Sequence, residues 1–535
     1  MTKLLAFDSI QDGNSITLLN SNGGGISSTS LPDLLHWLAY SSTGGCLRVV
    51  WDIDSFIALI LRLMPEQLLK LLASNSDDAI YDGNSMFYAL HKIFRIRKAY
   101  YYGLQEFFLS NTPEPSSVIE LQERADELTE ALSLLGMGDF QRIASPIAIF
   151  EQTELGRKTY EQIPRDYEIP PYVSGLLEYA DQADRKEWIS NYQVGHWDSL
   201  FDWDVSAQYS SIASYLVHLH DLEYWRSNTI TRREEGALFG FCKGRMWIDP
   251  DHEYQHCSPI MVKDIGNGTQ GNPAGWLTED CYSLSEVRFI QNSGLGEFIV
   301  EDGYFAKVQN GVRPRYPFKD IMDYLYQHRG WSEMCSSITK NIANQLVGKL
   351  AEHLKWRGGR EGELYNSVYH SLITTGGRVK VARWLLDNQV SKDELVCVQT
   401  DGCRITQDIL APTTNGLGKW RCNGSFPTLV ASPNIVLAQD KKPQHYTHDK
   451  IVNEIKAHPN QSYYGMEAEH RTTLGQAIEW GDITKVGEVI TLPAHLDLFS
   501  IPRQQSRRYG KLPRTGKQLL SGVYQSAPCI LLEGV

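Results

Sequence analysis

The chain has no apolar run long enough to cross a membrane, because its best one, residues 56–64, is broken by Arg62. Its nine cysteines lack paired C-x-x-C spacing, so the sequence indicates neither a zinc ribbon nor a disulfide framework and predicts a reducing compartment. The start M-T-K-L-L-A-F-D is too short and too acidic for a signal peptide. We therefore expect a cytoplasmic protein with no membrane partner.

Positive charge is also scarce overall. The net charge of −13 argues against indiscriminate binding of nucleic acid. A local basic stretch, residues 501–517, nevertheless carries six basic residues and no acid: Arg503, Arg507, Arg508, Lys511, Arg514 and Lys517. It is either a phosphate-binding segment or a solvated tail. The basic and aromatic residues 94–102 fit either stacking on single-stranded bases or a buried amphipathic helix.

Internal repeats and long low-complexity linkers are absent, and 535 residues exceed one small core, so several subdomains are expected. Residues 1–185 have an α/β pattern. Strands are predicted near residues 3–8, 15–20 and 47–52, and helices over residues 54–73 and 117–136.

Two acids follow strand-like segments in the second half of the chain. Asp204 ends the run S-L-F-D-W-D, and Asp401 follows the alternating segment E-L-V-C-V-Q-T. Gly402 permits a tight turn directly after Asp401, which predicts a β-hairpin with a carboxylate at its tip. Carboxylates from separate strand ends are what Mg²⁺ requires for phosphoryl transfer, although an Asp beside a Gly is also an ordinary turn residue.

A predicted helix between these acids offers a positive charge. Lys340, Asn344, Val347 and Gly348 are spaced to share one helical face. A lysine there can neutralise a triphosphate and its leaving pyrophosphate. The alternative is an amphipathic helix with a solvated lysine.

One further motif points to different chemistry. Residues His252 to His256 match the H-E-x-x-H pattern of zinc proteases. Pro250 and Pro259 bracket the segment and leave fewer than three turns of helix, and no third ligand follows at a familiar spacing. We therefore expect a loop that connects strands.

Taken together, three segments resemble the catalytic motifs of family B DNA polymerases, particularly the small phage, viral and organellar-plasmid branch. They are D-V-S-A-Q-Y-S-S-I (204–212), K-N-I-A-N-Q-L-V-G-K (340–349) and V-Q-T-D-G (398–402). Smaller elements agree with this resemblance: a Tyr-x-Gly-Gly-like element at Tyr192 and Gly195, a Thr-x-x-Gly-Arg element, and a Lys-x-Tyr-like element at Arg507 and Tyr509.

The resemblance implies a role for each matching residue. Asp204, Val205 and Asp401 would bind two Mg²⁺ ions, with Mn²⁺ as a substitute, and Lys340 would complete the catalytic set. Tyr209 would lie under the sugar and exclude a 2′-hydroxyl. The incoming nucleotide would also contact Lys340, Asn344 and Arg329. The three smaller elements would contact the primer–template DNA. Their residues are Tyr192 and Gly195 in the first, Thr374, Gly377 and Arg378 in the second, and Arg507 and Tyr509 in the third.

The sequence also departs from the family pattern. Gln399 replaces the first acid of the third motif, and Gln345 and Val347 replace Ser and Tyr in the second. In the amino-terminal third, Asp8 and Asp52 match carboxylates of the family's exonuclease, but Ile10 stands where a Glu is expected. The third exonuclease element is also missing, since Tyr179 is followed by Asp184 one residue late. Proofreading is therefore expected to be lost.

The implied fold is α/β and α+β multidomain, with an exonuclease-like (RNase H-like) amino-terminal domain and a right-hand polymerase palm, fingers and thumb. The expected parts are 1–185 exonuclease-like, 186–310 palm with a strand-rich insertion, 311–350 fingers, 351–435 palm and 436–535 thumb-like.

The predicted function is template-directed DNA synthesis, and the alternative is an inactive polymerase fold that serves as a DNA-binding scaffold. Expected partners are primer–template DNA, deoxynucleoside triphosphates, and a priming protein or replication accessory proteins. A viral origin would place the protein in the host-cell cytoplasm or nucleoid. The short stretch between Lys340 and Asp401 leaves protein priming open.

Overall fold

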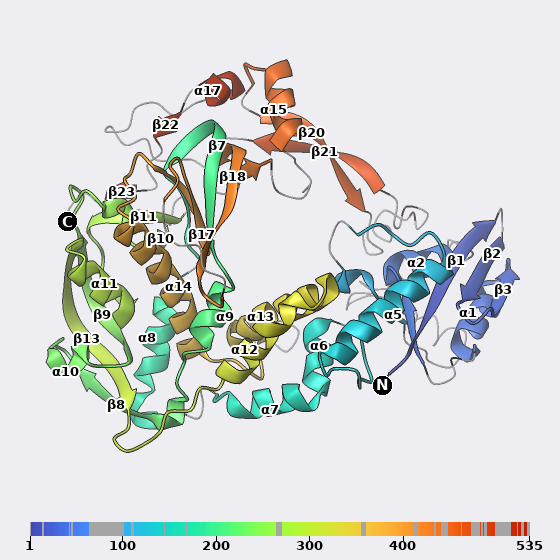
Figure 1. The fold of residues 1–535 in the computed structure, drawn as a ribbon, viewed down its shortest axis with the longest axis horizontal. Helices are drawn as coiled ribbons and strands as arrows, with labels where there is room; N and C mark the ends of the chain where they lie inside the picture. The colour runs from blue at the N-terminus through green and yellow to red at the C-terminus, as the bar shows by residue number, and fades with distance from the viewer. Residues whose placement is uncertain are drawn as a thin grey trace. The chain divides into compact units, whose positions relative to one another are not determined.

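The structure is a computed structural model, and Figure 1 shows its ribbon. It describes residues 2–12, 15–41, 43, 46–61, 63, 101–108, 112–143, 145–165, 169–185, 187–263, 270–354, 360–409, 416–432, 435–439, 448–461, 463–471, 482, 485, 489–497, 515–521, 523–525 and 529–531. The chain forms two compact units. Unit 1 contains Met1–Lys158, Gln327–Ile342 and Met466–Ala494, and unit 2 contains Thr159–Tyr326, Ala343–Gly465 and His495–Val535. This division differs from the five expected parts, which stay predictions.

In the described part of unit 1, five strands form one sheet in the order β3-β2-β1-β4-β5. Strands β1 to β3 pair antiparallel, whereas β4 runs parallel to β1 and β5 parallel to β4. The strands are β1 (Leu4–Asp12), β2 (Ser15–Asn20), β3 (Gly25–Ser28), β4 (Leu47–Val50) and β5 (Tyr101–Gly103). Three of them confirm the strands predicted near residues 3–8, 15–20 and 47–52.

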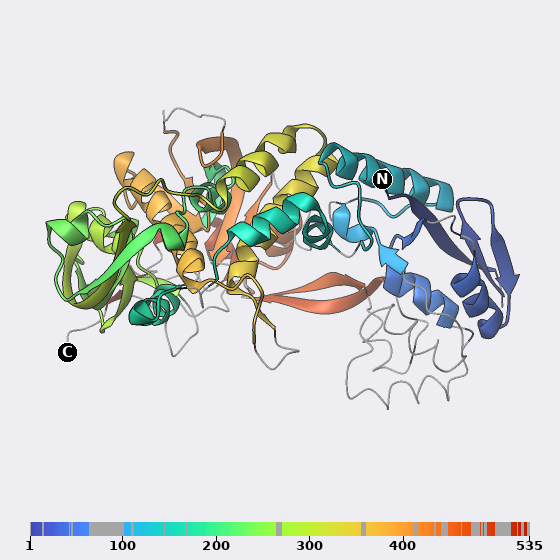
Figure 2. The same cartoon turned by 90° about the horizontal axis from the view of Figure 1, so that it is seen from below.

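Helices cover both faces of this sheet (Figure 2). Along β1, Leu5 and Phe7 alternate with Leu4 and Ala6. Leu5 and Phe7 pack into a core with α1 (Leu31–Tyr40) and α2 (Ile53–Leu61). On the other face lies α5 (Val118–Leu134), which begins where Ser117 accepts a hydrogen bond from the Glu120 backbone N–H. Helix α5 lies within the predicted range 117–136. Helix α2 begins near the predicted residue 54, and residues 64–73 of that prediction lie outside the described residues.

In the described part of unit 2, the first of two larger sheets has the order β19-β18-β7-β17-β16-β6, with β22 paired to β7. We call it the central sheet. Its strands are β6 (Ile189–Asn191), β7 (Gln193–Val205), β16 (Leu395–Gln399), β17 (Gly402–Ile405), β18 (Trp420–Ser432), β19 (Ile435–Ala438) and β22 (Tyr524–Gln525). Strands from residues 189 and 395 onward therefore meet in one sheet.

The second sheet is formed mainly by strands between residues 222 and 308. Its order is β10-β11-β9-β13-β8, with β12 paired to β9 and β23 paired to β11. Its strands are β8 (Leu222–Ser227), β9 (Phe239–Ile248), β10 (Val262–Lys263), β11 (Gln270–Trp276), β12 (Asp280–Ser283), β13 (Gly296–Val308) and β23 (Cys529–Leu531).

One long helix, α14 (Ser367–Asp387), packs between these two sheets (Figure 1). Trp384 of α14 stacks on Trp420 with ring centroids 4.4 Å apart and lies 5.2 Å from Trp203. The same continuous core includes α11 (Leu284–Asn292) and both inner sheet faces. Trp203 of β7 and Trp420 of β18 therefore point to α14, and the residues next to them in each strand, Asp204 and Arg421 among them, point to the opposite face of the sheet.

Two helices flank residue 330, as the sequence predicted. Helices α12 (Lys319–Gln327) and α13 (Glu333–Gly348) are joined by the 3₁₀ turn η6 (His328–Gly330), as expected for two helices that meet at Gly330. The other helices are α6 (Pro146–Gln152), α7 (Glu154–Gln162), α8 (Gly175–Ala183), α9 (Gln208–Ala213), α10 (Arg232–Glu235), α15 (His448–Ala457) and α17 (Gly516–Ser521).

The shorter elements complete the described chain. Two small strand pairs are β14 (His353–Leu354) with β15 (Arg360–Glu361), and β20 (Tyr463–Arg471) with β21 (Val489–Asp497). The 3₁₀ turns are η1 (Gln105–Phe107), η3 (Pro171–Val173), η4 (Leu219–Asp221), η5 (Gln255–Cys257) and η7 (Lys349–Ala351). Within the described ranges, no helix has the length and apolar character that a membrane crossing needs.

Candidate active site

The two predicted carboxylates lie on neighbouring strands of the central sheet. Asp204 is the penultimate residue of β7, and Asp401 lies in the turn between β16 and β17. Gly402 of β17 pairs directly with Asp204, and the Val205 backbone N–H donates to the Asp401 carbonyl at 2.9 Å. Both acidic residues are half-buried. The sheet therefore brings together the two acids that the sequence singled out.

Backbone geometry holds the hairpin turn that carries Asp401. Thr400 has a φ of 56°, a left-handed conformation that is uncommon for a residue with a side chain. Its N–H donates to the Trp188 carbonyl at 2.8 Å, which holds the turn in place. A Cβ at Gly402 would lie 2.5 Å from the Trp203 carbonyl oxygen, so the approach of β17 to β7 requires glycine.

This donor set suits magnesium. Carboxylate oxygens are hard ligands, and Mg²⁺ commonly takes one or two of them, keeping waters and substrate phosphates in its remaining positions. Among the described residues, no group of three or more His, Cys, Asp or Glu side chains could hold a metal ion, so these two acids stand as a pair. Asp204 and Asp401 would supply the carboxylates of an open magnesium site, and the carbonyl of Val205 would add a backbone oxygen; such a site stays a prediction.

An arginine that sequence reasoning missed contacts one of these acids. Arg421 of β18 lies directly opposite Asp204 in the strand register, and its Nη2 is 3.1 Å from Asp204 Oδ2. On the same face of β7, Asp202 lies 3.4 Å from Nη2 of Arg404, a side chain that is 2% exposed. The contact between Arg421 and Asp204 follows from the pairing of β18 with β7. The sequence of either strand alone does not reveal that register.

Tyr209 lies close to the acidic pair. It belongs to α9, which follows Ala207, and a Cβ on Gly377 of α14 would lie 3.1 Å from its Cε1. The Gln208 side chain donates to the Gly377 carbonyl at 2.9 Å and ties α9 to α14. Burial, with the negative charges of Glu187 and Asp401, raises the pKa of the Tyr209 hydroxyl. The hydroxyl therefore stays protonated at neutral pH.

The residues of the middle motif lie on α13 as predicted. Lys340 and Asn344 are exposed one turn apart, whereas Val347 is buried. Lys340 belongs to unit 1, as does the half-buried Arg329 of η6, while Asn344 and both carboxylates belong to unit 2. The predicted contacts of Lys340 and Arg329 with a triphosphate stay predictions.

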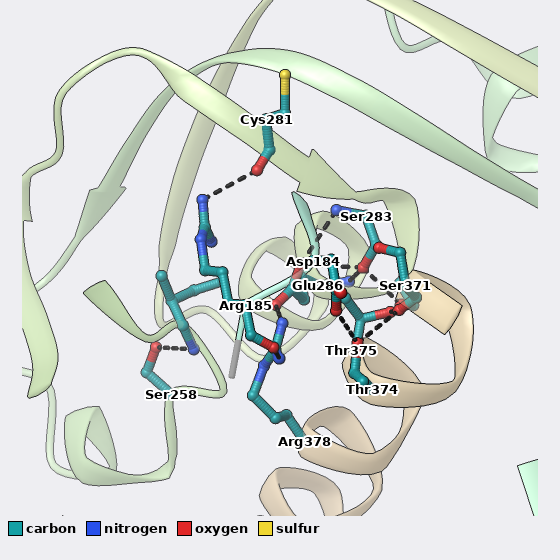
Figure 3. Close-up of polar contacts among 12 residues, drawn as sticks. Asp184, Arg185, Ser258, Cys281, Ser283, Glu286, Ser371, Thr374, Thr375 and Arg378 are labelled. Carbon is teal, nitrogen blue, oxygen red and sulfur yellow. Dashed lines mark hydrogen bonds and ion pairs between the residues drawn. The ribbon is translucent and has the colours of Figure 1, made fainter. Parts of the chain in front are cut away.

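Two residues of the Thr-x-x-Gly-Arg element are buried. Arg378 is 2% exposed, its Nη2 lies 2.7 Å from Glu286 Oε1, and its Nη1 donates to the Arg185 carbonyl (Figure 3). Thr374 is also buried, and its hydroxyl donates to Asp184 Oδ1 at 2.8 Å. In this structure the guanidinium of Arg378 is enclosed by protein, and the direct DNA contact expected of it stays a prediction.

The Tyr-x-Gly-Gly-like element is likewise internal. Tyr192 is 2% exposed, and its hydroxyl donates to the His256 carbonyl at 2.9 Å. Gly195 has a φ of 156° and pairs with Val430 inside the central sheet. In this structure the Tyr192 side chain contributes to packing, and its expected contact with DNA stays a prediction.

The H-E-x-x-H segment does not form a protease site. Only residues 255–257 are helical, as the 3₁₀ turn η5, so the two histidines cannot lie one helical turn apart on one face. His256 is buried, and its Nε2 lies 2.9 Å from the Val390 carbonyl. The segment connects strands, as the sequence predicted.

Most residues of the two basic stretches lie outside the described residues. Arg507 and Tyr509 are outside the described residues, as are residues 94–100. Lys517, on α17, is exposed. The predicted contacts of these segments with nucleic acid stay predictions.

Two carboxylates that the sequence matched to an exonuclease lie in the described part of unit 1. Asp8 lies on β1, and Asp52 follows the neighbouring parallel strand β4. Burial, with the charge of Glu114, raises the pKa of Asp8 despite a hydrogen bond from the Ser9 N–H. Ile10, at the position where a Glu is expected, is 50% exposed.

The near-match to the third exonuclease element belongs to a different part of the molecule. Tyr179 and Asp184 lie in unit 2. There the Tyr179 hydroxyl donates to Asp302, and Asp184 contacts His370 and Thr374. Neither residue therefore completes a site with Asp8 inside unit 1.

Comparison by sequence finds no matching family model and no matching curated protein. Comparison by structure finds Phi29 DNA polymerase. Its orthorhombic crystal form has a TM-score of 0.55 at 12% identity, covering 93% of this chain and 100% of that chain. Its binary complex with primer-template DNA has a TM-score of 0.55 at 14% identity, with the same coverage. Its ternary complex with incoming nucleotide has a TM-score of 0.51 at 14% identity, covering 82% of this chain and 86% of that chain. This protein therefore has a mixed α/β, multidomain fold similar to that of Phi29 DNA polymerase.

Proposed function

We propose that this protein is a family B-type DNA polymerase that adds deoxynucleotides to a primer 3′ end. The observation that carries the proposal is the pairing of the Asp204 and Asp401 strands, which brings two distant carboxylates to one end of the central sheet. The fold similarity to Phi29 DNA polymerase supports it. Tyr209 beside Asp401, and Asn344 exposed on α13, are consistent with a nucleotide site.

The reaction assigns each residue a task. The primer 3′-oxygen bonds to the α-phosphorus as the bond to the pyrophosphate oxygen breaks, and the hydroxyl proton passes to solvent. Asp204 and Asp401 would hold two magnesium ions, which when bound supply charge stabilisation at the attacking and leaving oxygens. Lys340 would neutralise the triphosphate. The Tyr209 ring would lie under the sugar and exclude a 2′-hydroxyl.

We further propose that unit 1 contains an inactive exonuclease-like domain. The strand order β3-β2-β1-β4-β5, with antiparallel strands on one side and parallel strands on the other, supports an RNase H-like fold. Ile10 stands in place of a Glu, and Tyr179 and Asp184 lie in unit 2, so the described part of this domain is short of the expected carboxylates. Hydrolysis by two metal ions requires those carboxylates.

The second candidate function is a DNA-binding scaffold with a retired active site. Gln399 in place of an acid and the ion pair between Arg421 and Asp204 favour it, because both weaken the negative field that attracts magnesium.

Primer extension with Mg²⁺ and deoxynucleotides separates the two candidates. We expect the purified protein to extend a primer, and Asp401→Asn to reduce the rate by about 10³-fold or more while DNA binding persists. Asp198→Asn, an exposed acid on the same strand as Asp204, is the matched control and should extend at the normal rate. Tight DNA binding without any extension would instead establish the scaffold.

A further inference from the structure

The ion pair between Arg421 and Asp204 lies where a divalent cation would bind. Arg421 and Asp204 are register partners on β18 and β7, and Nη2 of Arg421 lies 3.1 Å from Oδ2 of Asp204. A divalent ion that bound Asp204 beside the guanidinium would meet a second positive charge on the same carboxylate. The two cations also repel each other, so they compete for Asp204.

The exposure of the pair to solvent indicates that Arg421 can be displaced from Asp204. Its side chain is 50% exposed and that of Asp204 is 22% exposed. Ion pairs this open to solvent are weak, because water screens the attraction and the long side chain loses freedom when held in one place. The neighbouring Arg404 is different, since its side chain is 2% exposed and lies 3.4 Å from Asp202. A structural role therefore suits Arg404, and a displaceable one suits Arg421.

The local geometry explains why a cation is useful there. Asp204 and Asp401 are held together by the pairing of Gly402 with Asp204 and by the bond from the Val205 N–H to the Asp401 carbonyl. Two carboxylates brought together in this way repel each other when both are ionised. A positive side chain on the third strand offsets that repulsion whenever metal is absent. A bulge between Cys422 and Gly424 follows Arg421 along β18.

We propose that Arg421 is a displaceable counter-ion of Asp204, which occupies the carboxylate in the metal-free protein and sets the divalent-ion concentration needed to load the site. This inference rests on the metal site of the proposed function and names a residue that regulates its occupancy. Arg421 is a positioning residue in this sense, because it acts on the reaction through Asp204.

Manganese binding to the DNA-free, full-length protein tests the proposal without measuring activity. The free Mn²⁺ signal in electron paramagnetic resonance is titrated at low ionic strength. Arg421→Gln is expected to bind Mn²⁺ about 3- to 10-fold more tightly than the unaltered protein, the range expected from screened repulsion between a divalent and a monovalent cation. Arg421→Lys, which keeps the charge, is expected to retain most of the competition.

Two controls make the outcome specific. Arg226→Gln removes the same charge from another exposed ion pair of unit 2, in which Nη2 of Arg226 lies 2.8 Å from Asp302, and should leave Mn²⁺ affinity unchanged. In an Asp204→Asn background, Arg421→Gln should have no effect. Circular dichroism confirms that each variant is folded.

The proposal is overturned if Arg421→Gln and the unaltered protein bind Mn²⁺ equally, or if the gain persists in the Asp204→Asn background. Primer extension by the same preparations separates this failure from failure of the proposed function. Tighter Mn²⁺ binding without extension would uphold the counter-ion and reject the polymerase. Primer extension together with unchanged Mn²⁺ binding would uphold the polymerase and reject the counter-ion.

Discussion

Three residues of the hairpin between β16 and β17 fix where the Asp401 carboxylate lies. Asp401 is presented by a turn in which Thr400 adopts a left-handed conformation. Gly402 lets the backbone of β17 approach Trp203. A carboxylate placed this way is held by backbone hydrogen bonds, so small changes next to it will move it relative to Asp204.

Gly402→Ala tests this constraint. The added Cβ would lie 2.5 Å from the Trp203 carbonyl oxygen, and backbone cannot move aside cheaply, so we expect a loss of about 1–3 kcal/mol in the free energy of unfolding. Primer extension should fall with it, because Asp401 is displaced. Urea denaturation and extension assays measure the two effects. Gly330→Ala, with nothing within 4 Å of the new Cβ, is the control and should be nearly neutral. Equal stability of both variants would contradict the close approach.

At the scale of single elements, α14 connects the candidate site to the rest of unit 2. Its glycines lie against α9, and Arg378 reaches Glu286, which also caps α11 through Ser283 (Figure 3). The sequence motif suggested contact with DNA for this arginine, whereas the packing assigns it to a buried ion pair.

Arg378→Gln distinguishes the two interpretations. Removing one partner of a buried pair leaves an uncompensated charge, so we expect a loss of about 3–5 kcal/mol in the free energy of unfolding. The affinity of the folded protein for primer–template DNA should stay the same. Arg383→Gln, an exposed arginine of the same helix, should change stability by less than about 0.5 kcal/mol. Weaker DNA binding at unchanged stability would restore the motif-based interpretation.

A histidine pair links β7 to α15. The His196 and His448 rings stack with centroids 5.3 Å apart, and their Nε2 atoms are 3.2 Å apart. Burial lowers the pKa of His196, and the charge of His448 lowers it further, whereas Asp198 opposes the shift. His448 also lies 2.8 Å from Asp449 through its Nδ1.

The depressed pKa of His196 predicts a pH dependence. The unfolded chain takes up a proton near pH 6.5 and the folded chain at a lower pH, so the stabilisation is complete above about pH 6.5 and is lost as the pH falls. The slope for one proton is at most about 1.4 kcal/mol per pH unit. Urea unfolding at pH 7.5 and 5.5 should show a smaller change for His196→Gln than for the unaltered protein. His36→Gln, an exposed histidine, should show no reduction. The same change in both variants would rule out the pair as its source.

At the scale of the whole molecule, the chain divides into two compact units that differ in what they retain. Unit 2 keeps a pair of carboxylates on adjacent strands, whereas unit 1 keeps Asp8 and Asp52 without the Glu expected at Ile10. This difference is the basis on which we propose synthesis without proofreading.

A nuclease assay on single-stranded DNA checks that consequence. We expect no degradation above background with Mg²⁺ present, and no difference between the unaltered protein and Asp8→Ala, because two-metal hydrolysis lacks its carboxylates. Primer extension by Asp8→Ala serves as the control for folding and should be normal. Degradation that disappears in Asp8→Ala would establish an active exonuclease.

Local patterns were sufficient for the elements and for part of the site. Alternation and turn residues predicted β1, β2, β4 and the hairpin around Asp401, because these depend on neighbours in the chain. Helical spacing predicted the shared face of Lys340 and Asn344. Motif order also identified Asp204 and Asp401 as partners, since phosphoryl transfer restricts which residue types serve.

What the sequence by itself determined was therefore the residue types, the local elements and the pairing of two acids as an expectation. Only the tertiary structure decided which side chains are buried and which strands are neighbours. It enclosed Arg378 and Tyr192 in protein, and it placed Arg421 opposite Asp204. The physical reason is that burial and strand register arise from contacts between distant segments, and no local pattern records them.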